Sequence, residues 1–312
     1  MTSQGTADTR PVLIWGGGGF LGTNLTERMA AGGRQVINVS RSHLTRTQMQ
    51  GVCYLAPDLA ELADLVAQSA CVIHMAHGSS PAAALPQMEA NLAGSMQLTF
   101  ALMRACAAHA VPLVYLSSGG AIYGPDAPVP TPESAPTYPI SPYGVEKLVA
   151  ERYLAIGAQQ LGLAYRVLRI SNPYGPWQTG LKPQGVIGIW MRNVLEGVPL
   201  ELRGDGSPQY DYVYVDDVIE AMVRVMAYDG PVDTFNIGSG QGRSLKEILV
   251  QLRLLCGDGL RVNTHDAAPA RVPVNVLDTS LAAQELGWRA MVDFEDGLRR
   301  SWDWMRQHHK GS

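Results

Sequence analysis

Short, mostly apolar runs alternate with amphipathic stretches along the first 170 residues of the chain. The runs lack a strict alternation of polar and apolar positions, which is typical of strands buried on both faces of a parallel sheet. The stretches between them repeat apolar residues at spacings of three and four, which predicts helices. Strands are predicted at 12–15, 36–39, 71–75, 113–116 and 165–170, and helices at 20–31, 88–106 and 141–161.

This order of elements predicts an α/β fold, a Rossmann-type doubly wound parallel sheet covered by helices on both faces. We expect the larger domain to span residues 11–170, with residues 209–238 returning to the sheet through strands at 212–215 and 234–237. After Ile170, Pro, Gly and Trp interrupt the pattern. Residues 171–208 and 239–307 are therefore expected to form a smaller, interleaved α/β lobe.

A glycine-rich loop joins the first predicted strand to the first predicted helix. Its glycines at 16, 19 and 22 lack a Cβ, which permits a tight turn, close approach to a pyrophosphate and close packing of helix on strand. The helix that follows directs its free N–H groups and positive end at the phosphates. The loop predicts a dinucleotide site with contacts from Gly16, Gly19, Phe20, Leu21 and Gly22.

The end of the second strand bears on which dinucleotide binds. An acidic residue there would accept hydrogen bonds from the ribose 2′-hydroxyl and repel a 2′-phosphate. The chain instead has Ser40, Arg41 and Ser42. Two hydroxyls and a guanidinium suit a phosphate, so we expect NADP(H) in preference to NAD(H). The alternative is that Arg41 is a solvated loop charge and the site accepts either cofactor.

Tyr143 and Lys147 stand four residues apart at the start of a predicted helix, so they share one face. A phenol has a pKa near 10 and is inert as a base near neutrality. A neighbouring ammonium favours the phenolate and lowers that pKa. Tyr143 can then exchange a proton with a sugar hydroxyl while a hydride moves to or from a nicotinamide. The alternative is an ordinary pair on a solvated helix.

With these motifs the chain resembles the extended short-chain dehydrogenase/reductases of the UDP-galactose 4-epimerase type, over residues 11–306. The shared motifs follow one another in the family's order, and they are much more specific for family and fold than for substrate. Beyond the glycine loop and the Tyr/Lys pair they lie at 58–59, 72–76, 91, 116–124, 171–176, 204–206, 211–217 and 235–238.

The resemblance implies a role for each matching position. Tyr143 would be the acid/base, and Lys147 would also bind the nicotinamide ribose. Asn172 would lie beside the substrate phosphates. The family usually forms homodimers through a four-helix bundle, here from helices near 86–109 and 143–160. Further cofactor contacts would come from Asp58 and Leu59 at the adenine, from Ala76 at the nicotinamide ribose, and from Met75, His77, Asn91 and Ser117; Gln184 would be a further substrate contact.

The chain departs from the family at the strand end before Tyr143. Family members commonly carry Ser or Thr five residues before the glycine of a Tyr-Gly pair, and that position is Gly119 here. Ser118 is the best available hydroxyl to bond the reacting oxygen, with Ser117 beside it. The alternative is that both serines only complete the strand.

Two further departures concern the arginines that grip the pyrophosphate of a nucleotide sugar in the family. One position is Tyr210 and the other is Ala268, with Arg271 three residues later. Arginine offers a fork of donors, whereas tyrosine offers one. Either Arg271 reaches in from a shifted loop, or the pocket takes another substrate. A nucleotide-diphosphate sugar remains the expected substrate.

The expected reaction is hydride transfer at C4 of an activated sugar. The residues at 40–42 favour an NADPH-dependent 4-ketoreductase, and a 4-epimerase with the same site is the alternative. A 4,6-dehydratase is disfavoured because that class has an Asp-Glu pair where this chain has Gly120 and Ala121. A cofactor-binding sensor without catalysis is a hypothesis from another class; its expected mark, loss of the Tyr or the Lys, is not seen.

The amino-acid composition excludes several other classes of protein and kinds of partner. The 312 residues are 46% hydrophobic and 17% charged with a net charge of −4, which is typical of a globular protein without nucleic-acid affinity. Neither an apolar stretch of membrane-spanning length nor a signal peptide is recognised, so we expect a cytoplasmic protein without a membrane partner. The four cysteines lack a CxxC spacing and are expected to be reduced thiols. His74 and His77 have no third ligand at metal spacing, so no metal is expected.

Overall fold

Seven parallel strands form the central sheet of the computed structural model, which describes residues 9–43, 48–76, 88–181, 184–257, 259–266 and 272–309. The strand order is β10-β6-β5-β4-β1-β2-β3. It runs outward from β1 in both directions, as in doubly wound folds. The strands are β1 (Val12–Trp15), β2 (Val36–Val39), β3 (Val52–Leu55), β4 (Cys71–His74), β5 (Leu113–Ser118), β6 (Tyr165–Ile170) and β10 (Thr234–Ile237).

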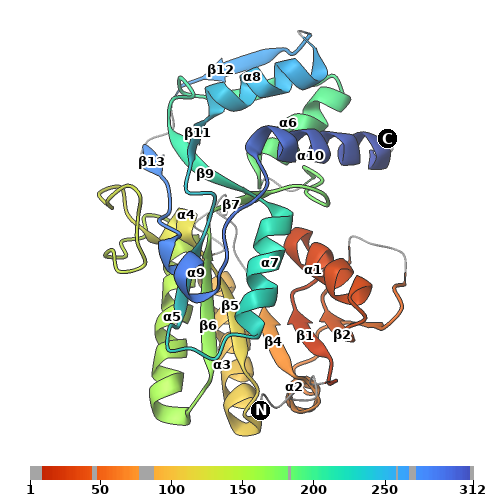
Figure 1. Ribbon diagram of the computed structural model, residues 1–312, viewed down its shortest axis with the longest axis vertical. Coiled ribbons are helices and arrows are strands. Elements are labelled where there is room, and N and C mark those ends of the chain that lie inside the picture. The colour runs from red at the N-terminus through yellow and green to blue at the C-terminus, as the bar shows by residue number, and fades with distance from the viewer. Residues whose placement is uncertain are drawn as a thin grey trace.

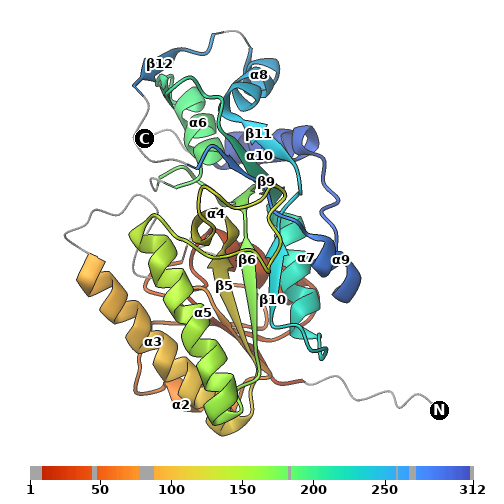
Figure 2. The same cartoon turned by 90° about the vertical axis from the view of Figure 1, so that its left-hand side faces the viewer.

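Helices cover both faces of this sheet. Figure 1 shows α1 (Phe20–Ala31) and α7 (Val215–Met226) side by side on one face. Figure 2 shows α3 (Met88–His109) beside α5 (Pro142–Leu161) on the other face, with α2 (Leu62–Ala67) next to α3.

Alternate residues of β1 enter different hydrophobic cores. Val12 and Ile14 pack with the side chains of α1 and α7, whereas Leu13 and Trp15 pack with those of α2, α3 and α5. A strand buried on both sides must be apolar at nearly every position. The predicted Rossmann-type α/β fold is confirmed.

The smaller lobe lies above the carboxyl ends of the strands in Figure 1. Its main sheet has the order β11-β9-β13, with β7 also paired to β9, and a second pair joins β12 to β8. The strands are β7 (Asn172–Tyr174), β8 (Leu200–Arg203), β9 (Gln209–Tyr214), β11 (Gly242–Ser244), β12 (Val262–His265) and β13 (Val274–Asn275). The remaining helices are the single turn α4 (Gly119–Ile122), then α6 (Val186–Leu195), α8 (Leu245–Cys256), α9 (Ser280–Glu285) and α10 (Phe294–His308).

The predicted return of residues 212–215 to the central sheet is wrong. Those residues end β9 and begin α7, and only β10 rejoins the sheet, beside β6. The buried Asp211 carboxylate holds β9 in the smaller lobe, because it accepts the backbone N–H groups of Ser239, Gly240 and Leu277 at 2.7 to 3.3 Å. Among the described residues, no helix combines the length and the apolar character that crossing a membrane requires.

Candidate active site

The glycine loop leaves space on one side only. Gly16 has φ +90°, and a Cβ there would lie 2.5 Å from the Ala76 nitrogen; a Cβ on Gly22 would lie 2.4 Å from the Gly17 Cα. Both positions therefore exclude any side chain. A Cβ on Gly19, by contrast, would meet nothing within 4 Å. Gly19 precedes the free N–H groups of α1, and such groups bind anions, so this open side could hold a pyrophosphate.

Asn38 of β2 holds this loop in place through hydrogen bonds, a role that was not predicted from the sequence. Its Nδ2 donates to the Gly17 carbonyl at 3.1 Å and to the Thr26 hydroxyl at 2.8 Å. The Thr26 hydroxyl donates to the Gly22 carbonyl at 2.7 Å. The signal in the sequence was a polar residue inside the otherwise apolar run 36–39.

The ends of β1, β2 and β4 meet beside the glycine loop. A Cβ on Gly18 would collide with Ser40 Oγ and the Ser42 carbonyl, so residues 40–42 lie against the loop, with Arg41 exposed. Met75 and Ala76 both donate their backbone N–H to the Trp15 carbonyl. The structure thus brings these predicted cofactor contacts together.

The other predicted cofactor residues are more scattered. Asp58 and Leu59 are exposed after β3, and Asp58 accepts the Ala60 N–H at 2.8 Å. Asn91 is half-buried near the start of α3. Ser117 is buried, and its hydroxyl donates to the Glu151 carboxylate. His77 lies outside the described residues.

The N-terminus of α5 carries Tyr143 and Lys147 to the end of β5. Ser141 caps the helix by accepting the Gly144 N–H at 3.1 Å, and Pro142 begins it. Lys147 is 1% exposed and donates from Nζ to the Leu116 carbonyl at 2.7 Å. This Nζ lies 5.8 Å from the centre of the Tyr143 ring.

A hydroxyl, a phenol and an ammonium thus converge at this strand end. Ser118 hydrogen-bonds the Tyr143 phenol. Burial raises the pKa of Tyr143 to about 12, although the Ser118 hydrogen bond lowers it in part. Burial lowers the pKa of Lys147 to about 8, against the opposing charges of Glu146 and Glu151. The expectation of a lowered phenol pKa is wrong for this structure, because burial, together with the negative charge of Glu146, outweighs the Ser118 hydrogen bond. Near pH 7 the pair is a phenol and an ammonium.

The glycine at position 119 has a steric explanation. A Cβ there would lie 2.5 Å from Leu277 Cδ1 and 3.0 Å from the Arg169 carbonyl. The hydroxyl near Tyr143 comes from Ser118 instead. A Cβ on Gly120 would lie 3.8 Å from both Ser118 Oγ and Asn172 Oδ1, so these two side chains border the same space.

The predicted substrate residues occupy the smaller lobe and its junction with the sheet. Asn172 donates from Nδ2 to the Asp211 carbonyl at 2.9 Å, which joins β7 to β9. Tyr210 is half-buried on β9 and pairs in register with Asn275 of β13. Asn275 in turn donates to the Gly119 carbonyl at 3.2 Å, which brings β13 to the end of β5. Gln184 is exposed just before α6, and Ala268 and Arg271 lie outside the described residues.

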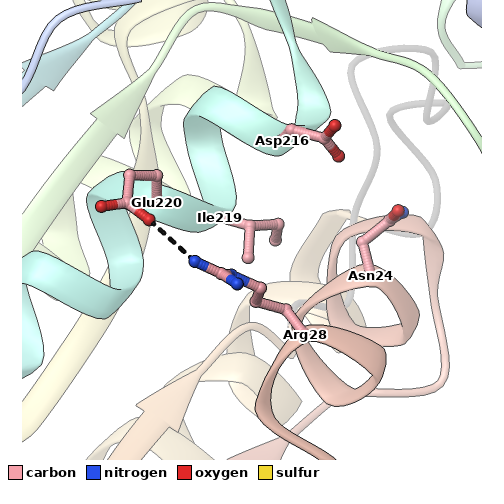
Figure 3. A pocket seen from close by; sticks show the side chains of 5 residues that line it. All are labelled: Asn24, Arg28, Asp216, Ile219 and Glu220. Atoms are coloured by element: carbon pink, nitrogen blue, oxygen red, sulfur yellow. Dashed lines mark hydrogen bonds and ion pairs between the residues drawn. The ribbon is translucent and has the colours of Figure 1, made fainter. Parts of the chain in front are cut away.

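Two other features of the described residues do not belong to this cluster. No group of three or more His, Cys, Asp and Glu side chains there could hold a metal ion. A cavity of about 360 Å³ opens between α1 and α7 (Figure 3). It lies on the sheet face opposite α5. Its lining includes the Arg28–Glu220 ion pair at 3.3 Å and none of the predicted site residues.

Comparisons with known proteins agree with this geometry. The sequence profile of the NAD-dependent epimerase/dehydratase family matches residues 12–238. The chain is 29% identical over 309 residues to a UDP-glucose 4-epimerase of Mycolicibacterium smegmatis, covering 94% of this chain and 98% of that one. It is 33% identical over 186 residues to the dTDP-4-dehydro-6-deoxyglucose reductase of Escherichia coli, a match that spans 60% of this chain and 58% of the reductase.

Solved structures show that the similarity extends to the fold of nearly the whole chain. A Thermotoga maritima UDP-glucose 4-epimerase with UDP-glucose superposes with a TM-score of 0.90 at 30% identity, covering 95% of this chain and 99% of that one. A Thermus thermophilus UDP-glucose 4-epimerase in complex with NAD has a TM-score of 0.84 at 29% identity, covering 96% and 100%. With its glycine loop, its Tyr143/Lys147 pair and this match over most of its length, the chain belongs to the NAD-dependent epimerase/dehydratase family.

Proposed function

We propose that the protein is a nucleotide-sugar 4-epimerase that uses a tightly held nicotinamide cofactor. The observation that carries the proposal is the convergence of Ser118, Tyr143 and Lys147 at the carboxyl end of β5, at the same edge of the sheet as the glycine loop that follows β1. The similarity to UDP-glucose 4-epimerases over nearly the full chain supports it. The reductase favoured by the sequence is supported by a similarity over a shorter part of the chain, 60% of its length.

The residues of this chain are suited to a nicotinamide dinucleotide, and each would have a separate role in the reaction. The space beside Gly19 and the ends of β1, β2 and β4 would hold a dinucleotide, whose nicotinamide supplies the hydride chemistry when bound. Tyr143 would take the proton of the C4 hydroxyl and return it, with Ser118 bonding the same oxygen. Lys147 would bind the ribose and favour the phenolate, and Asn172 would lie at the phosphates.

The smaller lobe, residues 171–208 and 239–307, would then bind the nucleotide sugar. A diphosphate needs cationic or N–H donors. Tyr210 stands where the family has an arginine and supplies only a phenol. We therefore propose that Arg271 supplies the guanidinium that binds the phosphates. The Arg271→Ala variant should raise the KM for a sugar nucleotide far more than it lowers kcat.

An NADPH-dependent 4-ketoreductase is the second candidate. It is favoured by Ser40, Arg41 and Ser42, where no carboxylate stands to repel a 2′-phosphate. The similarity to the E. coli reductase points the same way. The Ser40→Asp variant should shift cofactor preference from NADPH toward NADH, and an unaltered ratio of their dissociation constants would refute this reading of the strand end.

One assay separates the candidates. The protein is incubated with UDP-glucose or UDP-galactose and NAD, and the C4 epimers are resolved by proton NMR. Epimer formation without net change of cofactor indicates the epimerase; oxidation of NADPH by a nucleotide-linked 4-keto sugar indicates the reductase. Tyr143→Phe should abolish either activity, whereas Tyr228→Phe, which removes a hydrogen bond to Glu285 outside the predicted site, should not. Cofactor binding without turnover on these substrates would favour a sensor.

We also propose a homodimer formed by α3 and α5. Val145, Tyr153, Ile156 and Leu161 are large apolar residues of α5 that are 41% exposed or more in the single chain. Exposed apolar side chains gathered on one element are typical of an interface. Light scattering during gel filtration should give about twice 33.6 kDa; a monomer at micromolar concentration would contradict the proposal.

A further inference from the structure

The Lys147 ammonium is buried, and among the described residues no carboxylate forms an ion pair with it. Only 1% of Lys147 is exposed, and burial lowers its pKa to about 8. A buried charge is unfavourable unless hydrogen bonds or a nearby negative potential compensate for the lost water. The groups that face Nζ therefore decide how firmly the ammonium is held.

Two contacts of Nζ come from consecutive residues of β5. Nζ donates to the Leu116 carbonyl at 2.7 Å and lies over the Tyr115 ring, 4.8 Å from its centre. The Tyr143 ring is farther away, at 5.8 Å. The face of an aromatic ring carries negative potential and attracts a cation within about 6 Å, most strongly where water is excluded. Tyr115 is 3% exposed, and burial raises its pKa well above the ordinary value, so the ring is that of a neutral phenol.

The Tyr115 ring is held from the neighbouring strand and from α3. Tyr115 stands in register with His74 of β4, and their ring centres are 5.2 Å apart. His74 is fully buried, and its Nε2 lies 3.0 Å from the Thr99 hydroxyl of α3. That hydroxyl donates its own hydrogen to the Ser95 carbonyl at 2.8 Å, so Nε2 donates to Thr99. The His74 ring is thereby fixed, and it limits the movement of the Tyr115 ring under Nζ.

We propose that Tyr115 is a positioning residue of the active site, because its ring face holds the Lys147 ammonium beside Tyr143. The other titratable groups near this ammonium are Glu146 and Glu151 of the same helix, and their charges do not depend on the electron density of the ring. The role of the ammonium in turnover rests on the proposed function. The relation between ring and ammonium does not, and it is measured without any substrate.

The chain is well suited to a direct titration because it has only four lysines, Lys147, Lys182, Lys246 and Lys310. The protein is labelled with ¹³Cε-lysine, and the Lys147 signal is assigned by its loss in Lys147→Met. The quantity measured is the pH at the midpoint of the Lys147 titration.

Fluorination of the ring tests its electron density with little change of shape. Tyr115→Phe keeps the ring and is the reference. Difluorophenylalanine and then pentafluorophenylalanine at the same position withdraw electron density from the ring face. The Lys147 midpoint should fall in steps along this series, by about one pH unit in total, because the ammonium loses its attraction to the ring. Equal midpoints for the three rings would overturn the proposal.

Three natural substitutions control for the hydroxyl and for packing. Tyr115→Phe should keep the midpoint close to that of the wild type; a fall as large as that of the pentafluorinated ring would overturn the proposal, since the hydroxyl would then be the group that acts. Tyr115→Met fills the space without a ring and should lower the midpoint. Tyr165→Met makes the same change at another buried tyrosine of this core, paired with Leu113 at the opposite end of β5, and should not. If the fluorinated proteins do not fold, Tyr115→Met decides, and a midpoint equal to or above that of Tyr115→Phe would overturn the proposal.

A second readout links the ring to turnover. Relative to Tyr115→Phe, the pentafluorinated ring should move the alkaline limb of kcat against pH to lower pH by about the same interval as the Lys147 midpoint. A shifted midpoint with an unmoved alkaline limb would refute the catalytic part of the proposal. If the wild type converts no sugar nucleotide, the proposed function fails, while the lysine titration still decides whether the Tyr115 ring holds the ammonium.

Discussion

The ion pair between Glu151 and Arg169 lies beside Ser117 near the end of β5, and its removal should destabilise the fold strongly. Both side chains are less than 10% exposed, and their closest N···O distance is 2.7 Å. Arg169 also donates to the Tyr123 hydroxyl at 2.8 Å and to the Glu133 carbonyl at 3.1 Å. The guanidinium is therefore fixed in place and cannot move to water when its partner is lost.

The Glu151→Gln substitution removes the charge and keeps the shape. A buried charge left without its partner lowers the free energy of unfolding by about 3–5 kcal/mol. For a chain of this size each kcal/mol lowers the melting temperature by about 2 °C, so the variant should melt about 6–10 °C below the wild type. Circular dichroism at 222 nm during heating measures the difference.

The matched control is Glu220→Gln. Glu220 pairs with Arg28 at 3.3 Å and Arg224 at 2.9 Å, but all three side chains are at least 37% exposed. Exposed pairs contribute about 1 kcal/mol or less, so this variant should melt within about 2 °C of the wild type. Adding Arg169→Met to Glu151→Gln should recover most of the lost stability, because the double variant has no unpaired buried charge at this site. Equal melting of Glu151→Gln and Glu220→Gln would refute the reasoning.

Three further predictions address the site itself. Gly119→Ser should lower stability by about 1–3 kcal/mol without raising kcat, because its Cβ would meet Leu277 and the Arg169 carbonyl; an active variant with unchanged melting would contradict this. Asn38→Leu should weaken cofactor binding about tenfold in a tryptophan-quenching titration, since Gly17 and Thr26 lose a donor, and an unchanged dissociation constant would count against that anchor. Burial lowers the pKa of Lys147 from its ordinary value of 10.5 to about 8, so the unfolded chain binds this proton more tightly, and stability should rise as the pH increases through this window. Urea unfolding should show that the free energy of unfolding of the wild type increases by up to about 3 kcal/mol over this pH range, and that Lys147→Met lacks this increase. If the two proteins show the same dependence of stability on pH, the prediction is wrong.

The amino-acid sequence by itself determined the larger fold and the position of the candidate site in it. Wholly apolar strands such as 12–15 can be satisfied only between two layers of helices, so the doubly wound sheet follows from local pattern. The glycine loop and the Tyr143/Lys147 pair also act through neighbours close in sequence, since a turn and a helical spacing of four are local geometry. These features were predicted from the sequence.

Only the tertiary structure decided the features that depend on distant partners. The strand at 209–214 has the pattern of a sheet strand, but its membership of the smaller lobe depends on bonds from Asp211 to residues 28 to 66 positions away. The pKa of Tyr143 depends on its burial at the end of β5, which outweighs the opposing effect of the Ser118 hydrogen bond. The partners of Glu146 and Glu151 come from α3 and β6. Periodicity reports which face of an element is buried, whereas the identity of what it is buried against is set by packing between elements remote in the chain.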